Sequence, residues 1–225
     1  MTTELIDFLE QFITENRLEL FDKVLENRTK FITVVLEDIY QSQNASAVLR
    51  TADCFGIQDV HVIENKNTYQ INPDVTLGSS KWLNLIKYNQ TEDNTLHAIN
   101  QLRDKGYRII ATTPHHDDTD LENFNLEKGK VALLFGTELN GLTDTAIANA
   151  DGYIKIPMYG FTESLNISVS AAVILQHLIF RLKNSNVNWQ LSETERKGIK
   201  LQWLKQTIKK SSVLIEEFLS KKNNN

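Results

Sequence analysis

Short β-branched strands alternate with amphipathic helices along most of this 225-residue chain, and this alternation limits the possible folds more than any other feature. Buried strands are predicted over residues 31–37, 60–64, 83–88, 108–112, 131–135 and 153–156. Helices are predicted over residues 3–26, 44–56, 94–105, 143–148 and 165–183. In the second of these, Asn44 is the expected N-cap and Gly56 the expected C-cap. Because strands that alternate with helices form mainly parallel sheets, we expect a doubly wound α/β fold with helices on both faces of the sheet.

The composition, with 41% hydrophobic and 24% charged residues, is typical of an ordinary soluble globular protein. Cys54 is the only cysteine, which excludes an internal disulfide and favours a reducing compartment. Residues 1–16 carry acids rather than the basic and then apolar pattern of a signal peptide. The sequence contains no run of about eighteen apolar residues, which a membrane-spanning helix would need. We therefore expect a cytoplasmic protein that does not cross a membrane.

The net charge of −5 is unevenly distributed along the chain. Residues 181–222 contain ten Lys or Arg against four Glu, which gives this segment a net charge of +6 and leaves −11 for the rest. Within it, Lys197, Lys200, Lys205 and Lys209 alternate with apolar residues at helical spacing, which predicts an amphipathic helix with one basic face. Such a face binds phosphates or is simply solvated, and the pattern alone leaves both interpretations open.

In an open α/β sheet the ligand binds beyond the carboxyl ends of the strands, so the loops that follow the strands are the places to seek a site. The loop after the first predicted strand has no glycine before its helix, which disfavours a Rossmann dinucleotide site, and no Walker sequence occurs. The loop GTELNGL, after the fifth strand, offers Gly136 and Gly141 for close backbone packing and Glu138 as its only charge. The loop PMYGFTESLN, after the last strand, places Ser164 and Asn166 at the N-terminus of the long helix.

Three motifs follow one another along the chain: NASAVLRTADCFGIQDVHVIE from Asn44, VALLFGTELNGLT from Val131 and IKIPMYGFTESLNISVSAAVIL from Ile154. In their order and spacing they resemble the SPOUT superfamily, and within it the SpoU/TrmH family of RNA ribose 2′-O-methyltransferases. The resemblance covers roughly residues 17–183, and the ERKGIKLQWL tail is similar to that of the tRNA-modifying members. The chain has Ser42 and Gln43 where the family often has a proline and a histidine.

The resemblance implies a deep trefoil knot in the C-terminal half of the sheet, S-adenosylmethionine as the cofactor held in that knot, and a homodimer. It divides the chain into an N-terminal helical extension over residues 1–28, a methyltransferase domain over residues 29–183 and a basic C-terminal helical extension over residues 184–225. The implied reaction is methyl transfer to a ribose 2′-hydroxyl of tRNA, at a D-loop guanosine (position 18), with the basic helix gripping the tRNA. Two alternatives stay open: the same reaction on ribosomal RNA, and a knotted RNA-binding or assembly protein without catalysis.

The resemblance also implies the site residues, and carries the catalytic roles over to Arg50, Asn44, Glu138, Ser164 and Asn166. The implied cofactor contacts, made mostly through backbone groups, fall on Thr112, Gly136, Ile156, Met158 and Leu165. A guanidinium is a poor general base, because its pKa exceeds about 12 and it has no acceptor. We therefore expect Arg50 to clamp a phosphate beside the target ribose and to stabilise the developing alkoxide.

Each of these residues also has a purely structural explanation. Asn44, Ser164 and Asn166 could serve simply as helix caps, and Glu138 could be an ordinary exposed residue of a turn. Arg50 could pair with Asp53, three residues further along the same helix. The His-His-Asp-Asp run at residues 115–118 contains metal-ligating residue types, but adjacent residues seldom converge on one ion. We expect no metal.

Overall fold

The computed structural model describes residues 2–70, 72–114 and 119–223. The chain divides into a larger unit, Thr29–Trp189, and a smaller unit made of Met1–Arg28 together with Gln190–Asn225. The larger unit contains β1 (Ile32–Glu37), α3 (Ser42–Cys54), β2 (Asp59–Ile63), α4 (Pro73–Thr76), η1 (Ser79–Trp82), β3 (Asn84–Tyr88), α5 (Asn94–Asp104), β4 (Arg108–Thr112), β5 (Thr119–Asp120), η2 (Leu121–Asn123), β6 (Val131–Phe135), α6 (Asp144–Ala148), β7 (Gly152–Lys155) and α7 (Ile167–Lys183). The smaller unit contains α1 (Thr2–Glu10), α2 (Glu15–Leu25), α8 (Glu193–Thr207) and α9 (Ser211–Asn223).

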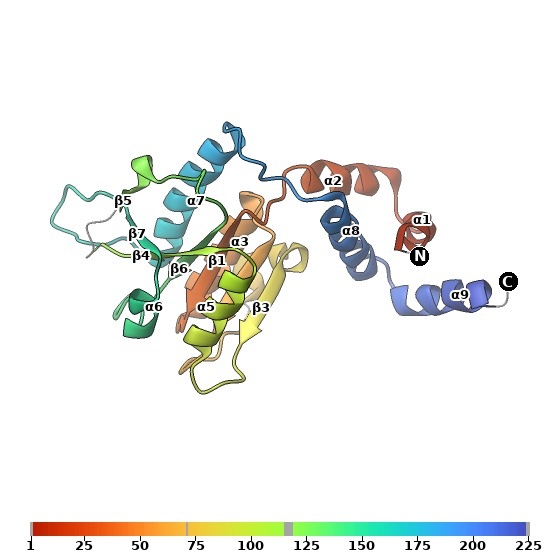
Figure 1. The fold of residues 1–225 in the computed structure, drawn as a ribbon. Helices are drawn as coiled ribbons and strands as arrows, with labels where there is room; N and C mark the ends of the chain where they lie inside the picture. Colours follow the sequence, from red (N-terminus) through yellow and green to blue (C-terminus); the bar gives the residue numbers. More distant parts are fainter. Residues whose placement is uncertain (1, 71, 115–118, 224–225) are drawn as a thin grey trace. The chain divides into compact units, whose positions relative to one another are not determined.

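The larger unit is built on one seven-stranded sheet in the order β3-β2-β1-β6-β4-β7-β5 (Figure 1). Every pair of neighbouring strands in it is parallel. On the interior strand β1, Val34 lies beside Val60 of β2 on one side and beside Leu133 of β6 on the other. The mainly parallel α/β sheet predicted from the sequence is confirmed. Because the strands are parallel, their carboxyl ends lie at a common edge, where a site is expected.

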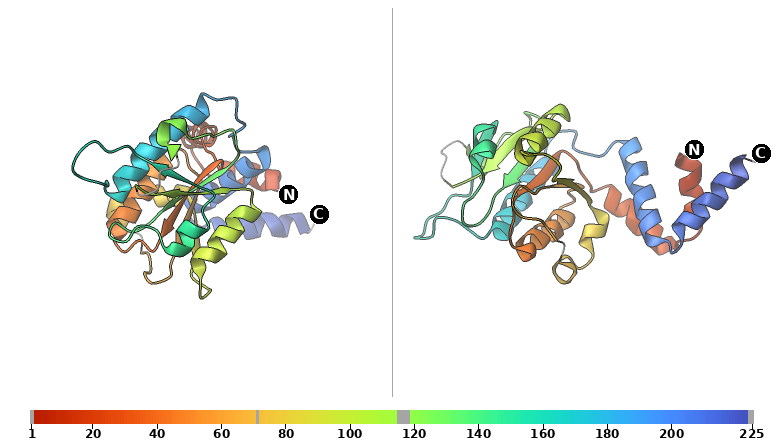
Figure 2. Two further views of the ribbon diagram at one scale, coloured as in Figure 1. Left: turned by 60° about the vertical axis from the view of Figure 1, so that its left-hand side comes forward. Right: turned by 90° about the horizontal axis from the view of Figure 1, so that it is seen from below.

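Helices cover both faces of this sheet, as predicted (Figure 2). Successive side chains of a strand point to opposite faces, so Val34 and Leu36 enter one core while Val35 enters the other. The first core also contains apolar residues of α3 and α7, and the second contains those of α5 and Ala146 of α6. All six residues of β1 are buried, and four of them are apolar, because the strand is covered on both faces.

The strongly periodic elements agree closely with the sequence prediction, and the differences have local causes. The bounds of β4 and β6 coincide with the predicted ones, whereas β5, α4 and the two 3-10 helices were not predicted. Each of these four has four residues or fewer, which is too short for a hydrophobic period to show in the sequence.

The prediction of one helix over residues 3–26 is wrong, because α1 ends at Glu10 and α2 begins at Glu15. The backbone of Thr14 is extended (φ −68°, ψ 146°), and its carbonyl accepts the amides of Arg17 and Leu18 as the new helix starts. No glycine or proline signals this break. The break lets both α1 and α2 pack against α8. The local sequence pattern of residues 3–26 gives no information about this packing.

The expected N-cap of α3 is also wrong. The helix begins at Ser42 with Gln41 as its N-cap residue, so Asn44 lies within the first turn. The amide of Asn44 is therefore directed to partners outside the helix. The other end is as expected: Gly56 follows the C-cap residue with a positive φ of 78°, and the Ile57 amide donates to the Ala52 carbonyl, which is the Schellman arrangement.

The smaller unit is a set of helices around Trp203, whose side chain is almost fully buried. The ring of Phe21 meets Trp203 edge-on, with ring centroids 5.4 Å apart. The Nζ atom of Lys200 lies 2.7 Å from carboxylate oxygens of both Glu10 and Asp22, so this lysine joins α8 to α1 and α2. Among the described residues, no helix of either unit has the length and apolar character needed to cross a membrane.

Candidate active site

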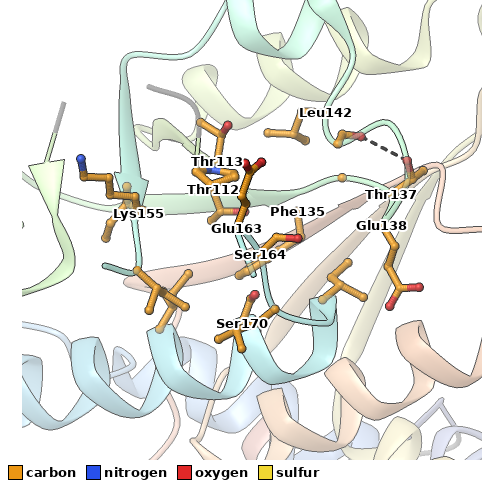
Figure 3. Close-up of a pocket in the computed structure, with 18 of the residues that line it drawn as sticks. Thr112, Thr113, Phe135, Thr137, Glu138, Leu142, Lys155, Glu163, Ser164 and Ser170 are labelled. Atoms are coloured by element: carbon orange, nitrogen blue, oxygen red, sulfur yellow. Dashed lines mark hydrogen bonds between the residues drawn. The ribbon is translucent and has the colours of Figure 1, made fainter. Parts of the chain in front are cut away.

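A cavity of about 320 Å³ opens where β4, β6 and β7 end and α7 begins (Figure 3). Its volume is within the range of small-molecule and cofactor sites. All five positions that the sequence resemblance assigns to the cofactor line it, together with two of the assigned catalytic residues: Thr112, Gly136, Ile156, Met158, Leu165, Glu138 and Ser164. The structure thus brings together residues that are up to 53 positions apart in the sequence.

The wall of the cavity formed by residues 136–142 is a tight backbone turn. Thr137 and Gly141 exchange two backbone hydrogen bonds of 2.9 and 3.0 Å, and Gly141 has a positive φ of 66°. A Cβ atom at Gly136 would lie 2.1 Å from the carbonyl carbon of Gly141 and 2.3 Å from the amide nitrogen of Leu142. Glycine is therefore required at position 136 so that the loop can pack on itself. The sequence pattern by itself suggests close packing against a ligand instead.

The lining combines apolar side chains with backbone polar groups. Leu142, Ile154 and Ile156 supply apolar surface, whereas the hydroxyl of Thr112 donates to the Leu134 carbonyl at 2.7 Å and is thus committed to the sheet. Such walls suit a ligand with an apolar body that is recognised through a few polar groups.

Three side chains from the three motifs meet at the edge of the cavity, and we call them the Asn-Glu-Asn network: Asn44 of α3, Glu138 of the turn and Asn166 at the start of α7. The Nδ2 atoms of Asn44 and Asn166 donate to the same Glu138 oxygen, Oε1, at 2.9 and 2.5 Å. Asn166 also donates to Oδ1 of Asn44 at 3.2 Å. Amide donors to an ionised carboxylate make strong hydrogen bonds, so the network joins motifs that are separated by up to 122 residues.

Asn166 has a structural role as well, because it is the N-cap residue of α7. Its Oδ1 accepts the Ser168 amide at 2.8 Å and the Ser168 hydroxyl at 2.6 Å. Its Nδ2 remains for Glu138 and Asn44. Capping therefore fixes the side chain in the orientation that the network needs, and the structural and functional explanations of this residue are compatible.

The structure does not bring Arg50 into this network. Arg50 is exposed on α3, six residues beyond Asn44 and so about 9 Å further along the helix axis. With the described residues it forms no hydrogen bond or ion pair, so the alternative pairing with Asp53 is absent. Ser164 is exposed on the cavity wall. Both side chains are accessible to a substrate that approaches from solvent.

The four lysines predicted to bind RNA all lie in the smaller unit, but the prediction of one helix for all four is wrong, because α8 ends at Thr207 and Lys209 lies beyond it. Their surroundings also differ. Lys205 and Lys209 are exposed and form no ion pair with the described residues. Lys197 pairs with Glu193 on the same helix at 2.7 Å, and Lys200 is held by its two carboxylates with only 17% of its side chain exposed. The unit as a whole contains eleven Lys or Arg and eleven Asp or Glu, because the acidic N-terminal helices pack with the basic C-terminal ones.

Sequence reasoning missed two residues of the site. Gln41 accepts a 2.8 Å hydrogen bond from Asn44 through its Oε1 and so supports the network from the N-cap position of α3. Glu163 lines the cavity beside Ser164. Nothing in the local pattern distinguishes Gln41 from a solvated loop residue, whereas Glu163 was visible as the only charge in the loop PMYGFTESLN.

A histidine with a strongly lowered pKa lies away from this cavity. His61 of β2 is 2% exposed, and burial, aided by repulsion from Lys105, lowers its pKa to about 3. Its Nδ1 lies 3.0 Å from the Tyr88 hydroxyl, and the two rings stack. Burial and Asp59 raise the pKa of Tyr88 to about 12. Both groups therefore stay neutral at physiological pH, as core residues do.

No group of three or more His, Cys, Asp or Glu in the part of the chain that the structure describes could hold a metal ion. The run at residues 115–118, considered above as a metal site, lies outside the described residues.

Comparisons with known proteins agree with this arrangement. Residues 31–176 match the profile of the SpoU rRNA Methylase family. A tRNA (guanosine(18)-2′-O)-methyltransferase of Borreliella burgdorferi is 47% identical over 204 residues, which cover 91% of this chain and 91% of that protein. The crystal structure of the A. aeolicus TrmH/SpoU tRNA modifying enzyme has a TM-score of 0.75 at 28% identity and covers 87% of this chain and 98% of that one. The SpoU methyltransferase AviRb of Streptomyces viridochromogenes, in complex with the cofactor AdoMet, shares the fold with a TM-score of 0.58 at 20% identity, over 73% of this chain and 62% of that one.

Proposed function

The chain belongs to the SpoU rRNA methylase family, and we propose that it transfers a methyl group from S-adenosylmethionine to the ribose 2′-hydroxyl of guanosine 18 in tRNA. The observation that carries this function is the cavity at the ends of β4, β6 and β7, bordered by the Asn-Glu-Asn network. The names of the relatives favour tRNA over ribosomal RNA as the substrate. The intact network argues against a protein that has lost catalysis.

The residues present fit S-adenosylmethionine. The cavity has an adequate volume, apolar walls for a planar base and an aliphatic chain, and the self-packed turn at Gly136 that holds those walls in place. We assign its binding to Thr112, Gly136, Ile156, Met158 and Leu165, mostly through backbone groups. When bound, the cofactor would supply an activated methyl group, which these residues would hold toward the ribose 2′-hydroxyl.

The chain itself has to position the ribose and offset the charge that develops on its oxygen. Glu138 receives two amide donors on Oε1, so its orientation is set before substrate binds. Ser164 and Asn166 lie on either side of Leu165 at the start of α7 and complete the proposed catalytic set.

Arg50, which is exposed and unpaired among the described residues, is proposed to clamp the phosphate beside the target ribose. A guanidinium binds phosphate through two parallel N–H donors, which the point charge of a lysine cannot reproduce. In an Arg50→Lys variant we expect a marked loss of turnover with unchanged S-adenosylmethionine binding. Near-normal turnover would show that the planar fork is unnecessary.

For the tRNA body we propose contacts by Lys197, Lys205 and Lys209 of the basic C-terminal extension. We do not include Lys200 among these contacts, because its ammonium group already forms ion pairs with Glu10 and Asp22. We assign it the task of holding α8 against α1 and α2. Phosphate contacts of this kind are steered by charge and weaken as salt rises.

We further propose a homodimer, supported by apolar side chains that are unusually exposed near the cavity. Leu139, Tyr159 and Phe161 are more than 90% exposed, and Val169 and Val173 form an outward stripe on α7. Exposed apolar patches of this kind mark interaction surfaces. Analytical ultracentrifugation is expected to give twice the chain mass of 25.8 kDa.

The family relationship also leads us to propose a trefoil knot around the cavity, residues 29–183 as the methyltransferase domain, and the cytoplasm as the location. The strand order supports the knot, because β6 lies between β1 and β4, and β7 lies on the far side of β4. Segments that follow one another in the chain are thus interleaved in space around the region where the cavity opens.

A methylation assay with labelled S-adenosylmethionine tests the function. The purified protein is incubated with unmodified tRNA, with the same tRNA carrying another nucleotide at position 18, and with ribosomal RNA fragments. Label in the first RNA alone supports the proposal. Label in ribosomal RNA alone would establish the alternative substrate, and label in none would remove the catalytic assignment.

A further inference from the structure

Among the residues that the structure describes, three with charged side chains line the cavity: Glu138, Lys155 and Glu163. In Figure 3 Glu163 is drawn among the lining residues, with Glu138 and Lys155 toward opposite sides of the view. The catalytic set carried by the three motifs does not include Glu163. Glu163 is exposed to solvent on this lining, where its charge acts on whatever ligand fills the cavity.

The two carboxylates differ in how they are satisfied. Oε1 of Glu138 receives two amide donors, which commit this carboxylate to the Asn-Glu-Asn network. Glu163 accepts no hydrogen bond and forms no ion pair with any residue that the structure describes. Its carboxylate is thus available to a ligand that fills the cavity.

From this placement we propose that Glu163 recognises the positive charge of the methyl donor and makes the site prefer S-adenosylmethionine over its demethylated product. The proposal rests on the function proposed above. The sulfonium of the donor carries a positive charge, and when its C–S bond breaks the sulfur keeps both electrons and becomes a neutral thioether. Amino, carboxylate and nucleoside groups are the same in both molecules, so their contributions cancel in the ratio of the two affinities.

This role has a consequence for turnover, because the attraction exists before methyl transfer and disappears with it. Two unit charges roughly 6 Å apart at an effective dielectric constant of about 40 attract each other enough to change an affinity about tenfold. The same carboxylate therefore helps to load the donor and does not retain the product.

Calorimetric titration of the full-length protein separates this role from that of a merely solvated loop residue. S-adenosylmethionine, S-adenosylhomocysteine and sinefungin, in which an amine-bearing carbon replaces the sulfonium, are titrated into the wild type and into Glu163→Gln, Glu163→Asp and Glu92→Gln variants. Glu92 is an exposed carboxylate outside the cavity lining and serves as the matched control. Thermal unfolding of each variant shows that it is folded.

We expect Glu163→Gln to weaken binding of the two cationic ligands about tenfold and that of S-adenosylhomocysteine less than twofold. The Glu163→Asp variant should keep most of the preference, and the control should keep all of it. Equal losses for donor and product, or no loss at all, would overturn the proposal while leaving the methyltransferase function intact. If the wild type itself binds no S-adenosylmethionine, the proposed function fails instead.

Discussion

Replacing Gly136 by alanine tests whether the self-packed turn at residues 136–142 holds the cofactor cavity open. The backbone of Gly136 does not have a positive φ, so alanine introduces no conformational strain, and only its Cβ matters. That atom would lie 2.1–2.3 Å from backbone atoms of Gly141 and Leu142, where ordinary contacts begin at 3.4 Å. The turn must therefore open by at least about 1 Å, which breaks the two hydrogen bonds between Thr137 and Gly141.

At about 1 kcal/mol for each lost hydrogen bond, the free energy of unfolding should fall by about 2 kcal/mol. For a unit of this size, such a loss lowers the melting temperature by roughly 4–8 °C. Because residues 136–142 line the cavity, we also expect S-adenosylmethionine affinity to fall by more than about tenfold.

Differential scanning calorimetry and titration calorimetry measure the two effects. A Gly160→Ala variant is the matched control, since a Cβ atom at Gly160 would meet nothing within 4 Å. The reasoning would be refuted by a Gly136→Ala protein that melts within about 1 °C of the wild type and binds the cofactor equally well.

An Asn166→Asp variant would set a second carboxylate against Glu138, and we expect turnover to fall on the order of 10²-fold, measured in single-turnover assays. The pKa of Lys200 is raised in the folded protein, because its hydrogen bonds to acidic side chains outweigh the burial that acts to lower it. A raised pKa stabilises the fold below the unfolded value of 10.5, so the stability of the smaller unit should fall as pH rises through and beyond 10.5, as thermal scans would show. Alanine at Lys205 or Lys209 should weaken tRNA binding and lower the slope of log affinity against log salt by about 1 in filter-binding titrations.

Each of these three predictions has a control or an outcome that would contradict it. An Asn166→Asp enzyme with wild-type turnover would remove the amide donor from catalysis. A Lys200→Met variant should lack the stability change near pH 10.5, and an unchanged pH profile would show that the ion pairs with Glu10 and Asp22 add nothing. Lys221 pairs with Glu217 at 2.6 Å, so Lys221→Ala should alter the tRNA salt slope less than the two exposed lysines do.

Where the sequence prediction failed, the deciding interaction was long-range. The break between α1 and α2 carries no glycine or proline and follows from packing against α8. Asn44 was expected to cap its helix, yet its amide serves Glu138, 94 residues away. On α8, Lys200 is held by acids of the N-terminal helices, a long-range pairing that the spacing of the lysines does not contain.

Local sequence alone determined the layers of this protein. Continuously apolar strands such as Val131–Phe135 require burial on both faces, and the glycine at position 56 ends α3 because a left-handed backbone suits it. The three motif loops could likewise be placed at one edge, since parallel strands share their carboxyl ends. Only the tertiary structure decided the contacts within those loops. Two amides share one oxygen of Glu138, the turn packs on Gly136, and the carboxylate of Glu163 has no partner among the described residues. The network joins segments up to 122 residues apart in the sequence, and the local sequence pattern does not specify how close such segments lie in space.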